Sequence, residues 1–373
     1  MSSFRRRLKC LTILCVAIFV GCPGPPIEED AAFDAPKEVA SPKDAPPPPV
    51  EDVPAEVADA TPLPADVEPV DAAPEVALDA AHPNPLDKVA YCKSGYGEPE
   101  VDTKLDTSEI VEASGLVASR AQPGVFWTHN DSGDGPRLYA LSDQGKLLAR
   151  LDLEGIEPTD IEDIAWASCP DSPADCLWVA DIGNNNVKRD EFALYVVPEP
   201  TLSGAGTPET LTAADVGIFR FDYPVEIPDA EALLVSPDGS KFWIFEKTSS
   251  PNARLFTSSA PLGSDNVQTL TEIQTFPSPG VDVPMGRMIT AADLHPSGLL
   301  MLLRTYTGVF EYELGEGFDF QPLLAEPTVV AWGPLDEPQG EAVAYDASGE
   351  GAWTLSEDPN FKGYQPLIHY PCL

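Results

Sequence analysis

The sequence predicts an all-β fold, a β-propeller with five blades, from three observations. Residues 89–373 contain five stretches in which a short apolar strand, a turn and a second apolar strand follow one another. The first strands begin at Ser114, Glu162, Glu231, Thr290 and Glu341, so the repeats are spaced by 48, 69, 59 and 51 residues. Four of the second strands are centred on tryptophan, at Trp127, Trp178, Trp243 and Trp353. Repeats near 50 residues with three or four strands each are typical of propeller blades.

Each repeat is expected to form the inner part of one blade. The strand–turn–strand units are 114–128, 162–179, 231–244, 290–303 and 341–354. Further strand-like runs follow at 137–141, 192–197, 254–256 and 308–312. Gly and Asp in the turns are typical of hairpins. A sixth, degenerate blade is the alternative to five, and a β-sandwich is the alternative to a propeller.

The cysteines predict how the ring closes. The last repeat offers only three strands, so we expect a strand from 89–111 to complete that blade. Cys92 and Cys372 lie at the two ends of the folded segment, and a disulfide between them would lock the closure. Cys169 and Cys176 bracket a short polar turn, and closing it stabilises the fold by about 2–3 kcal/mol. Zinc is the competing use of four cysteines, but the spacing is too wide for a Cys-x₂₋₄-Cys pair.

The N-terminus predicts export. Three arginines and Lys9 precede an apolar run of 11 residues, 10–20, which is typical of a signal peptide spanning 1–21. The stretch 19–22 resembles the bacterial lipoprotein signal, in which Cys22 would receive acyl chains such as palmitate. Ordinary cleavage near Gly21 is the alternative. Pro23 in place of Asp after the cysteine favours a lipid anchor in the outer membrane or at the cell surface of the envelope.

Residues 22–88 are expected to form a disordered stalk before the propeller domain, 89–373. Positions 23–88 hold 16 prolines and 16 acidic residues, with no apolar periodicity that would bury a core. The whole chain has a formal net charge of −39. Such acidity excludes a nucleic-acid partner bound through bulk charge, because phosphate backbones need a basic surface.

Acidic residues are expected to gather at one rim of the propeller. In an antiparallel blade, the start of the first strand and the end of the second lie at the same rim. Repelling carboxylates there favour a hard cation, and Ca²⁺ takes oxygen ligands. The predicted calcium ligands are Asp131, Glu162, Asp163, Asp181, Glu231 and Glu341. Capping of turns and solvation of the rim is the alternative role of these acids.

A second set of polar residues is expected to bind a ligand on this rim. Its members are His129, Asn130, Asp134, Glu246, Lys247, Arg304 and Glu357. Lys247 and Arg304 would either pair with neighbouring glutamates, which we favour, or hold a phosphate or carboxylate against a metal. His129 is the candidate general base. The chain contains no Gly-x-Ser-x-Gly, His-Glu-x-x-His, Walker or Rossmann signature.

Four motifs resemble those of exported bacterial propeller proteins of mostly unknown activity. These are 129–134 (His-Asn-Asp-Ser-Gly-Asp), 161–165 (Ile-Glu-Asp-Ile-Ala), 181–185 (Asp-Ile-Gly-Asn-Asn) and 339–342 (Gln-Gly-Glu-Ala). That group is loosely similar to phytase-like esterase and NHL-type propellers. The resemblance implies a propeller fold and implies no particular reaction.

Two functions are therefore expected from the sequence. The first is a membrane-anchored propeller that binds a small ligand or a protein through its acidic, calcium-binding rim. The alternative is a metal-dependent hydrolase of phosphoesters or other esters. No convincing nucleophile is present, and the chain has only four histidines, so binding is favoured over hydrolysis. Whether the protein is an enzyme is left open.

The anchor is testable by replacing Cys22 with serine. Because the acyl chains hold the protein through about 0.8 kcal/mol per buried CH₂, C22S should be released from membranes or accumulate unprocessed. Fractionation of cells followed by immunoblotting measures this. An unchanged, detergent-dependent membrane fraction would contradict lipidation.

Overall fold

A computed structural model describes residue 86 and residues 89–373, apart from 132, 171, 186–188, 225, 259–262, 264–265, 284, 333–336 and 359–362. All of these belong to the second of the two units into which the chain divides, Val76–Leu373; the first is Met1–Glu75. The predicted signal peptide, Cys22 and most of the predicted stalk lie outside the described residues. No helix in this described part is long and apolar enough to cross a membrane.

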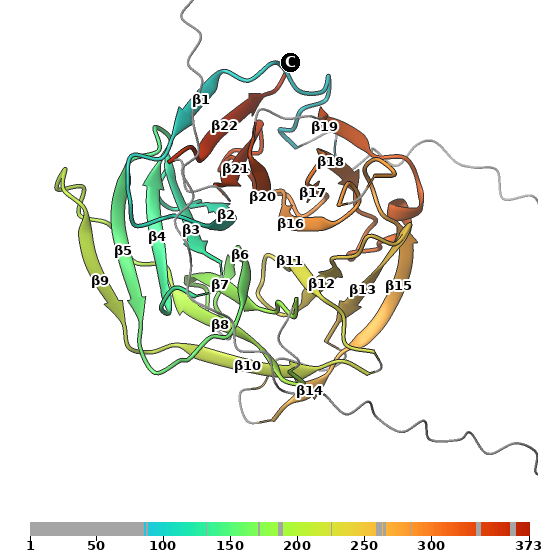
Figure 1. Cartoon of the computed structure of the whole chain (residues 1–373), viewed down its shortest axis with the longest axis horizontal. Helices are drawn as coiled ribbons and strands as arrows, with labels where there is room; N and C mark the ends of the chain where they lie inside the picture. Colours follow the sequence, from blue (N-terminus) through green and yellow to red (C-terminus); the bar gives the residue numbers. More distant parts are fainter. Residues whose placement is uncertain are drawn as a thin grey trace, which may run out of the picture. The chain divides into compact units, whose positions relative to one another are not determined.

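Five β-sheets surround a central axis, which confirms the predicted five-bladed propeller (Figure 1). Each sheet contributes one inner strand to the ring. The inner strands are β2 (Ala113–Ala118), β6 (Ile161–Ser168), β11 (Ala230–Val235), β16 (Ile289–Leu294) and β20 (Gln339–Tyr345). They pack against one another in this order, and β20 packs against β2. We number the blades 1 to 5 accordingly.

The remaining strands continue each blade outward in antiparallel order. Blade 1 continues with β3 (Val125–Asn130), β4 (Arg137–Ser142) and β5 (Leu147–Leu153), and blade 2 with β7 (Asp175–Asp181), β8 (Phe192–Pro198) and β10 (Gly217–Asp222). Blade 3 continues with β12 (Phe242–Glu246), β13 (Asn252–Thr257) and β15 (Thr271–Pro277). Blade 4 continues with β17 (Leu300–Thr305), β18 (Gly308–Glu313) and β19 (Thr328–Trp332), and blade 5 with β21 (Gly351–Glu357), β22 (Pro366–Pro371) and β1 (Val101–Lys104).

Chain from the following blade covers the outer edges of blades 1 to 3. The strand β9 (Glu209–Ala213) leaves blade 2 and pairs in parallel with β5 of blade 1. The short strand β14 (Gln268–Thr269) leaves blade 3 and pairs in parallel with β10 of blade 2. Blade 4 contributes the 3₁₀ helix η2 (Gln321–Leu324), and Gln274 Nε2 of β15 donates to Phe320 O beside it, at 2.9 Å. Covered edges expose fewer unpaired backbone groups.

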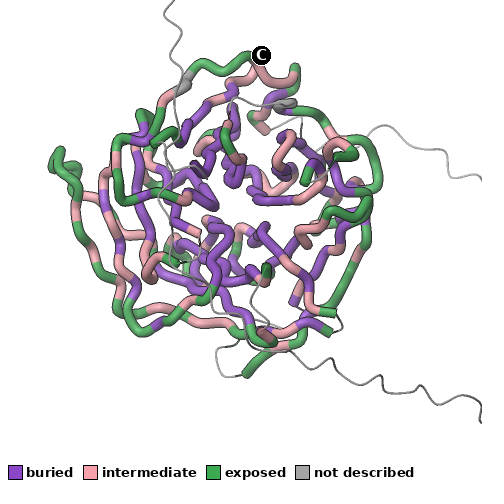
Figure 2. The backbone as a smooth tube through the Cα atoms, viewed as in Figure 1, coloured by how far each residue is buried: buried purple, intermediate pink, exposed green. Residues whose placement is uncertain are grey.

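The core lies between the blades. Every described residue of β2, β11 and β16 is buried, whereas the outer strand β9 has no buried residue (Figure 2). Trp127, Trp178 and Trp243 each pack toward the following blade; Trp178, for example, shares a cluster with Phe242 and Phe256 of blade 3. The recurring tryptophans therefore contribute to packing between the blades.

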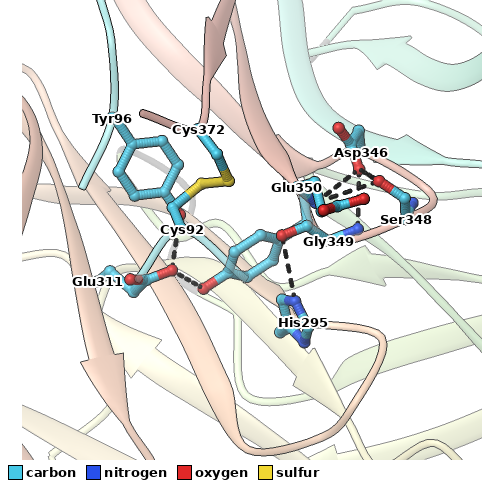
Figure 3. Close-up of a disulfide and its surroundings, with 10 residues drawn as sticks. Cys92, Tyr96, His295, Glu311, Asp346, Ser348, Gly349, Glu350 and Cys372 are labelled. Carbon is cyan, nitrogen blue, oxygen red and sulfur yellow. Dashed lines mark hydrogen bonds between the residues drawn. A yellow bond between two sulfur atoms is a disulfide. The ribbon is translucent and has the colours of Figure 1, made fainter. Parts of the chain in front are cut away.

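The N-terminal strand closes the ring, also as predicted. β1 pairs with β22 antiparallel, with Asp102 opposite Ile368, and completes blade 5. Cys92 and Cys372 form a disulfide beside this closure (Figure 3). Tyr96 OH donates to Glu311 Oε1 of blade 4 at 2.6 Å. A covalent bond and a partly buried hydrogen bond thus both hold the N-terminal segment in place.

Cys169 and Cys176 form the second predicted disulfide, across the turn between β6 and β7. Both cysteine pairs are thereby used, and the alternative of a zinc site is wrong. The first bridge closes a loop with a sequence separation of 280, and the second a loop with a separation of 7.

The two disulfides should differ in their contribution to stability. In the chain-entropy model, the long loop contributes about 5 kcal/mol and the short loop about 2–3 kcal/mol. The C92S/C372S variant should therefore lose about twice as much free energy of unfolding as C169S/C176S. Denaturant titration of both variants and the parent measures this, and equal losses would contradict a ring held by its closure.

Candidate functional site

The inner strands share a β-bulge near their first residues. The bulged residues are Gly115, Glu162, Glu231, Thr290 and Glu341. A bulge redirects the side chain of its extra residue. All five bulges lie at the same end of the ring. We call this end the mouth of the channel. It also includes the residues that follow β3, β12 and β17 and the last residue of β21.

Three carboxylates from two blades meet at the mouth. One oxygen each of Asp131, Asp160 and Glu162 lies within 4.8 Å of the other two. Asp131 follows β3 of blade 1, whereas the other two acids lie at the start of blade 2. Glycine at position 183 makes this approach possible, because a Cβ there would overlap the carboxylates of Asp160 and Glu162.

Glu162 is the least satisfied member of this group. Its side chain is 2% exposed, and its Oε1 has no hydrogen-bond partner among the described residues. Burial raises the pKa of Glu162, and the charges of Glu231, Asp131 and Asp160 raise it further. Burial and Asp131 likewise raise the pKa of Asp160 to about 6. A bound cation would remove this penalty, because it favours the charged form of each acid.

The other two bulged glutamates have partners inside the protein. Lys247 Nζ forms an ion pair with Glu231. Gln339 Nε2 donates to Glu341 Oε1 at 2.7 Å, and also to Glu357. Burial raises the pKa of Glu357 to about 7, with Glu341 adding to the effect. In this half of the mouth, Lys247 therefore balances the charge of Glu231, and Gln339 provides a hydrogen-bond donor to Glu341.

Asp163 and Asp181, both predicted calcium ligands, accept hydrogen bonds from backbone N–H groups, and Asp181 also accepts them from side chains. The Asp163 carboxylate accepts N–H bonds from Ile164, Leu233 and Ala292 at 2.9, 2.8 and 3.2 Å. Asp181 accepts the N–H groups of residues 159 and 160, the hydroxyl of residue 195 and the guanidinium of residue 189. The structure therefore brings Asp131 and Glu162 together, whereas the carboxylates of Asp163 and Asp181 are occupied by hydrogen bonds within the protein.

Several of the predicted ligand-binding residues also have internal partners. Asn130 Oδ1 accepts the N–H of residue 111, and its Nδ2 donates to Asp134 at 2.8 Å. Glu246 accepts two hydrogen bonds from the guanidinium of Arg254. Arg304 is fully buried and pairs with Glu337. The favoured prediction for Lys247 and Arg304, pairing with glutamates, is confirmed.

His129 is buried behind the mouth and is fully inaccessible to solvent. Its Nδ1 lies 2.9 Å from Asn130 O, and in the part of the chain described here its Nε2 has no partner. Burial lowers the His129 pKa to about 4, so the ring is neutral. Gly115 leaves room for this ring, because a Cβ at position 115 would lie 2.5 Å from Nε2.

Three residues at the mouth do not belong to either of the ligand sets predicted from the sequence: Asp160, Gln339 and Tyr306. Asp160 precedes Glu162 by two residues, and Gln339 precedes Glu341 in the same way. Tyr306 follows β17 at the place where Lys247 follows β12. Each of the three occupies a repeat position aligned with another residue at the mouth, and this alignment could have identified it. Gln339 and Tyr306 offered no other signal, because neither side chain belongs to a charge pattern.

Comparison with known proteins identifies neither a family nor a function for this chain. No protein-family model matches the chain, and no curated protein matches its sequence. A similar solved structure is the Cps50 (Swd1) β-propeller domain of Myceliophteria thermophila, with 9% identity and a TM-score of 0.37, over 73% of this chain and 100% of that one. Another is Raptor of Chaetomium thermophilum, with 11% identity and a TM-score of 0.41, over 75% of this chain and 29% of that one. Neither similarity tells what this chain binds.

The raised pKa values predict the pH dependence of stability. The pKa of Asp160 is about 6 against an ordinary 3.8, and that of Glu357 about 7 against 4.5. Between about pH 4 and 7 the folded protein therefore holds protons that the unfolded chain has released, so stability falls as pH rises. In chelator, the free energy of unfolding should decrease over this range.

The E357Q variant should show a smaller decrease, because glutamine does not titrate. Denaturant titrations at pH 4.5, 6 and 7.5 measure the slope. The matched control is E313Q, which alters an exposed glutamate on β18 and should keep the parent slope. An E357Q slope equal to the parent's would refute the raised pKa.

Proposed function

We propose that this propeller binds a small ligand or a protein partner through the mouth of its channel, with a Ca²⁺ ion held by Asp131, Asp160 and Glu162. The supporting observation is the buried Glu162 oxygen that lacks a partner among the described residues, beside two further carboxylates. An acidic cluster alone is common on surfaces. A carboxylate that is buried, unpaired and directed into the cluster is costly unless an ion binds it.

Calcium suits the donor set of this cluster. Ca²⁺ takes six to eight oxygen ligands at 2.3–2.6 Å in flexible geometry, whereas Mg²⁺ demands a near-ideal octahedron. Three carboxylates leave several coordination positions for water or ligand oxygens. Asp131 is partly exposed, so these positions would open toward solvent. The class of ligand that follows is one with carboxylate, phosphate or carbonyl oxygens.

A hydrolase is the less supported function. The sequence offered His129 as general base, but that ring is fully buried and its pKa is lowered to about 4. A base must reach the proton that it abstracts.

We also propose, from the sequence alone, that the protein is exported and lipid-anchored at the cell envelope.

Thermal unfolding with Ca²⁺ and with EDTA tests the cation site. An ion that binds only the folded state stabilises by about 2.7 kcal/mol at one hundred times its Kd. For a domain of this size, the Tm should rise by about 2–4 °C. The E162Q variant should lose the calcium-dependent part of the shift, because it removes the buried charge that the ion neutralises.

The control for E162Q is again E313Q, which should keep the full calcium shift. The triple variant E162Q/E231Q/E341Q should also lose the shift while retaining the fold, as judged by circular dichroism. A parent Tm that is indifferent to both millimolar Ca²⁺ and EDTA would disprove the cation site.

A further inference from the structure

The acid pair at the start of blade 2 is repeated at the start of blade 3. Asp160 precedes Glu162 by two residues, and Asp229 precedes Glu231 by two. Glu162 and Glu231 are both bulged residues of inner strands, and both are buried. The fold therefore presents two quasi-equivalent carboxylate pairs to the same mouth.

The two pairs differ in the side chain that faces them from the end of a neighbouring strand. Asp131, which follows β3, adds a third carboxylate to the Glu162 pair. Counted from the bulge, the equivalent residue beyond β7 is Gly183, which brings no side chain to the Glu231 pair. Instead Lys247, which follows β12, pairs with Glu231. One pair is thus left with an unsatisfied oxygen, and the other already has a cation.

The Lys247 ammonium acts on more than its direct partner. Its side chain is 10% exposed, and its Nζ lies 5.4 Å from the centre of the Tyr306 ring. Burial alone would lower the Lys247 pKa, but Glu231, Tyr306 and Glu341 raise it above its ordinary value. Lys247 also interacts electrostatically with Glu162. The charge therefore lies among the bulged glutamates of three different blades.

We propose that Lys247 is a built-in cation that fills the central position of the mouth, so that the protein takes a single divalent ion, between blades 1 and 2. This inference rests on the proposed function for the position of that ion. Without the ammonium, the carboxylates of Glu231 and Glu341 repel each other across a buried space, which favours a second cation there.

The test counts the ions bound by the purified full chain, with Ca²⁺ as the probe. Isothermal titration calorimetry gives the affinity, and native mass spectrometry gives the number of ions. The parent should bind one ion, and K247M should bind two. The first ion should also bind about tenfold more tightly in K247M, because one positive charge has left the mouth.

Three variants control the charge, the position and the site. K247R keeps the cation and should bind one ion. K241M removes an exposed lysine that lies immediately before β12, and this variant should bind one ion, like the parent. E162Q/K247M should bind one ion, now at the Glu231 position. E231Q/K247M removes both members of the ion pair, and serves if K247M does not fold; it should bind one ion.

The outcomes separate this inference from the proposed function. One ion in the parent and one ion of equal affinity in K247M would overturn the role of Lys247 and leave the proposed function intact. No ion in the parent but one in K247M would overturn the proposed site, and with it the single ion between blades 1 and 2, while it would support Lys247 as the cation that excludes an ion from the Glu231 position. Two ions in E231Q/K247M would overturn the inference, because the second ion would not depend on Glu231.

Discussion

The ring of inner strands imposes one constraint on the rest of the structure: backbone N–H groups that face the channel have no neighbouring strand to accept them. An unpaired, buried N–H costs free energy comparable to a lost hydrogen bond. Asp163 of blade 2 accepts the N–H groups of Leu233 and Ala292 in blades 3 and 4. Asp293 of blade 4 accepts that of Tyr345 in blade 5, at 2.7 Å. Buried carboxylates on the axis thus join blades that are not all neighbours.

This constraint explains why an acidic channel holds two kinds of carboxylate. Those deeper in the ring are saturated by backbone donors and fix the blades to one another. Among the described residues, the side chains of the bulged glutamates at the mouth accept no backbone N–H group, so they need a side chain or an ion. Lys247 and Gln339 meet that need for Glu231 and Glu341. Glu162 is the member of the bulged set whose oxygen lacks a partner within the described residues.

The fold could be predicted from the sequence because its signals are local and repeated. Spacing identified the blades, and the even set of cysteines identified the closure. The site was predicted less well, because the saturation of a buried carboxylate depends on which backbone donors the fold places around it, and the spacing of residues in the sequence does not show this. Asp163 and Glu162 are adjacent in sequence, yet Asp163 accepts three N–H groups, whereas Oε1 of Glu162 has no hydrogen-bond partner among the described residues. Only the register of β6 and its bulge separates them.

The closing disulfide and the mouth lie at opposite ends of the channel. Glu357, at the mouth, ends β21, whereas Gly351 begins it at the opposite end of the channel. The closing disulfide lies at that opposite end, because Cys372 N donates to Glu350 O. Leu86, the first described residue, belongs to a core cluster with residues of blades 4 and 5. The covalent closure and the candidate cation site therefore lie at opposite ends of the channel.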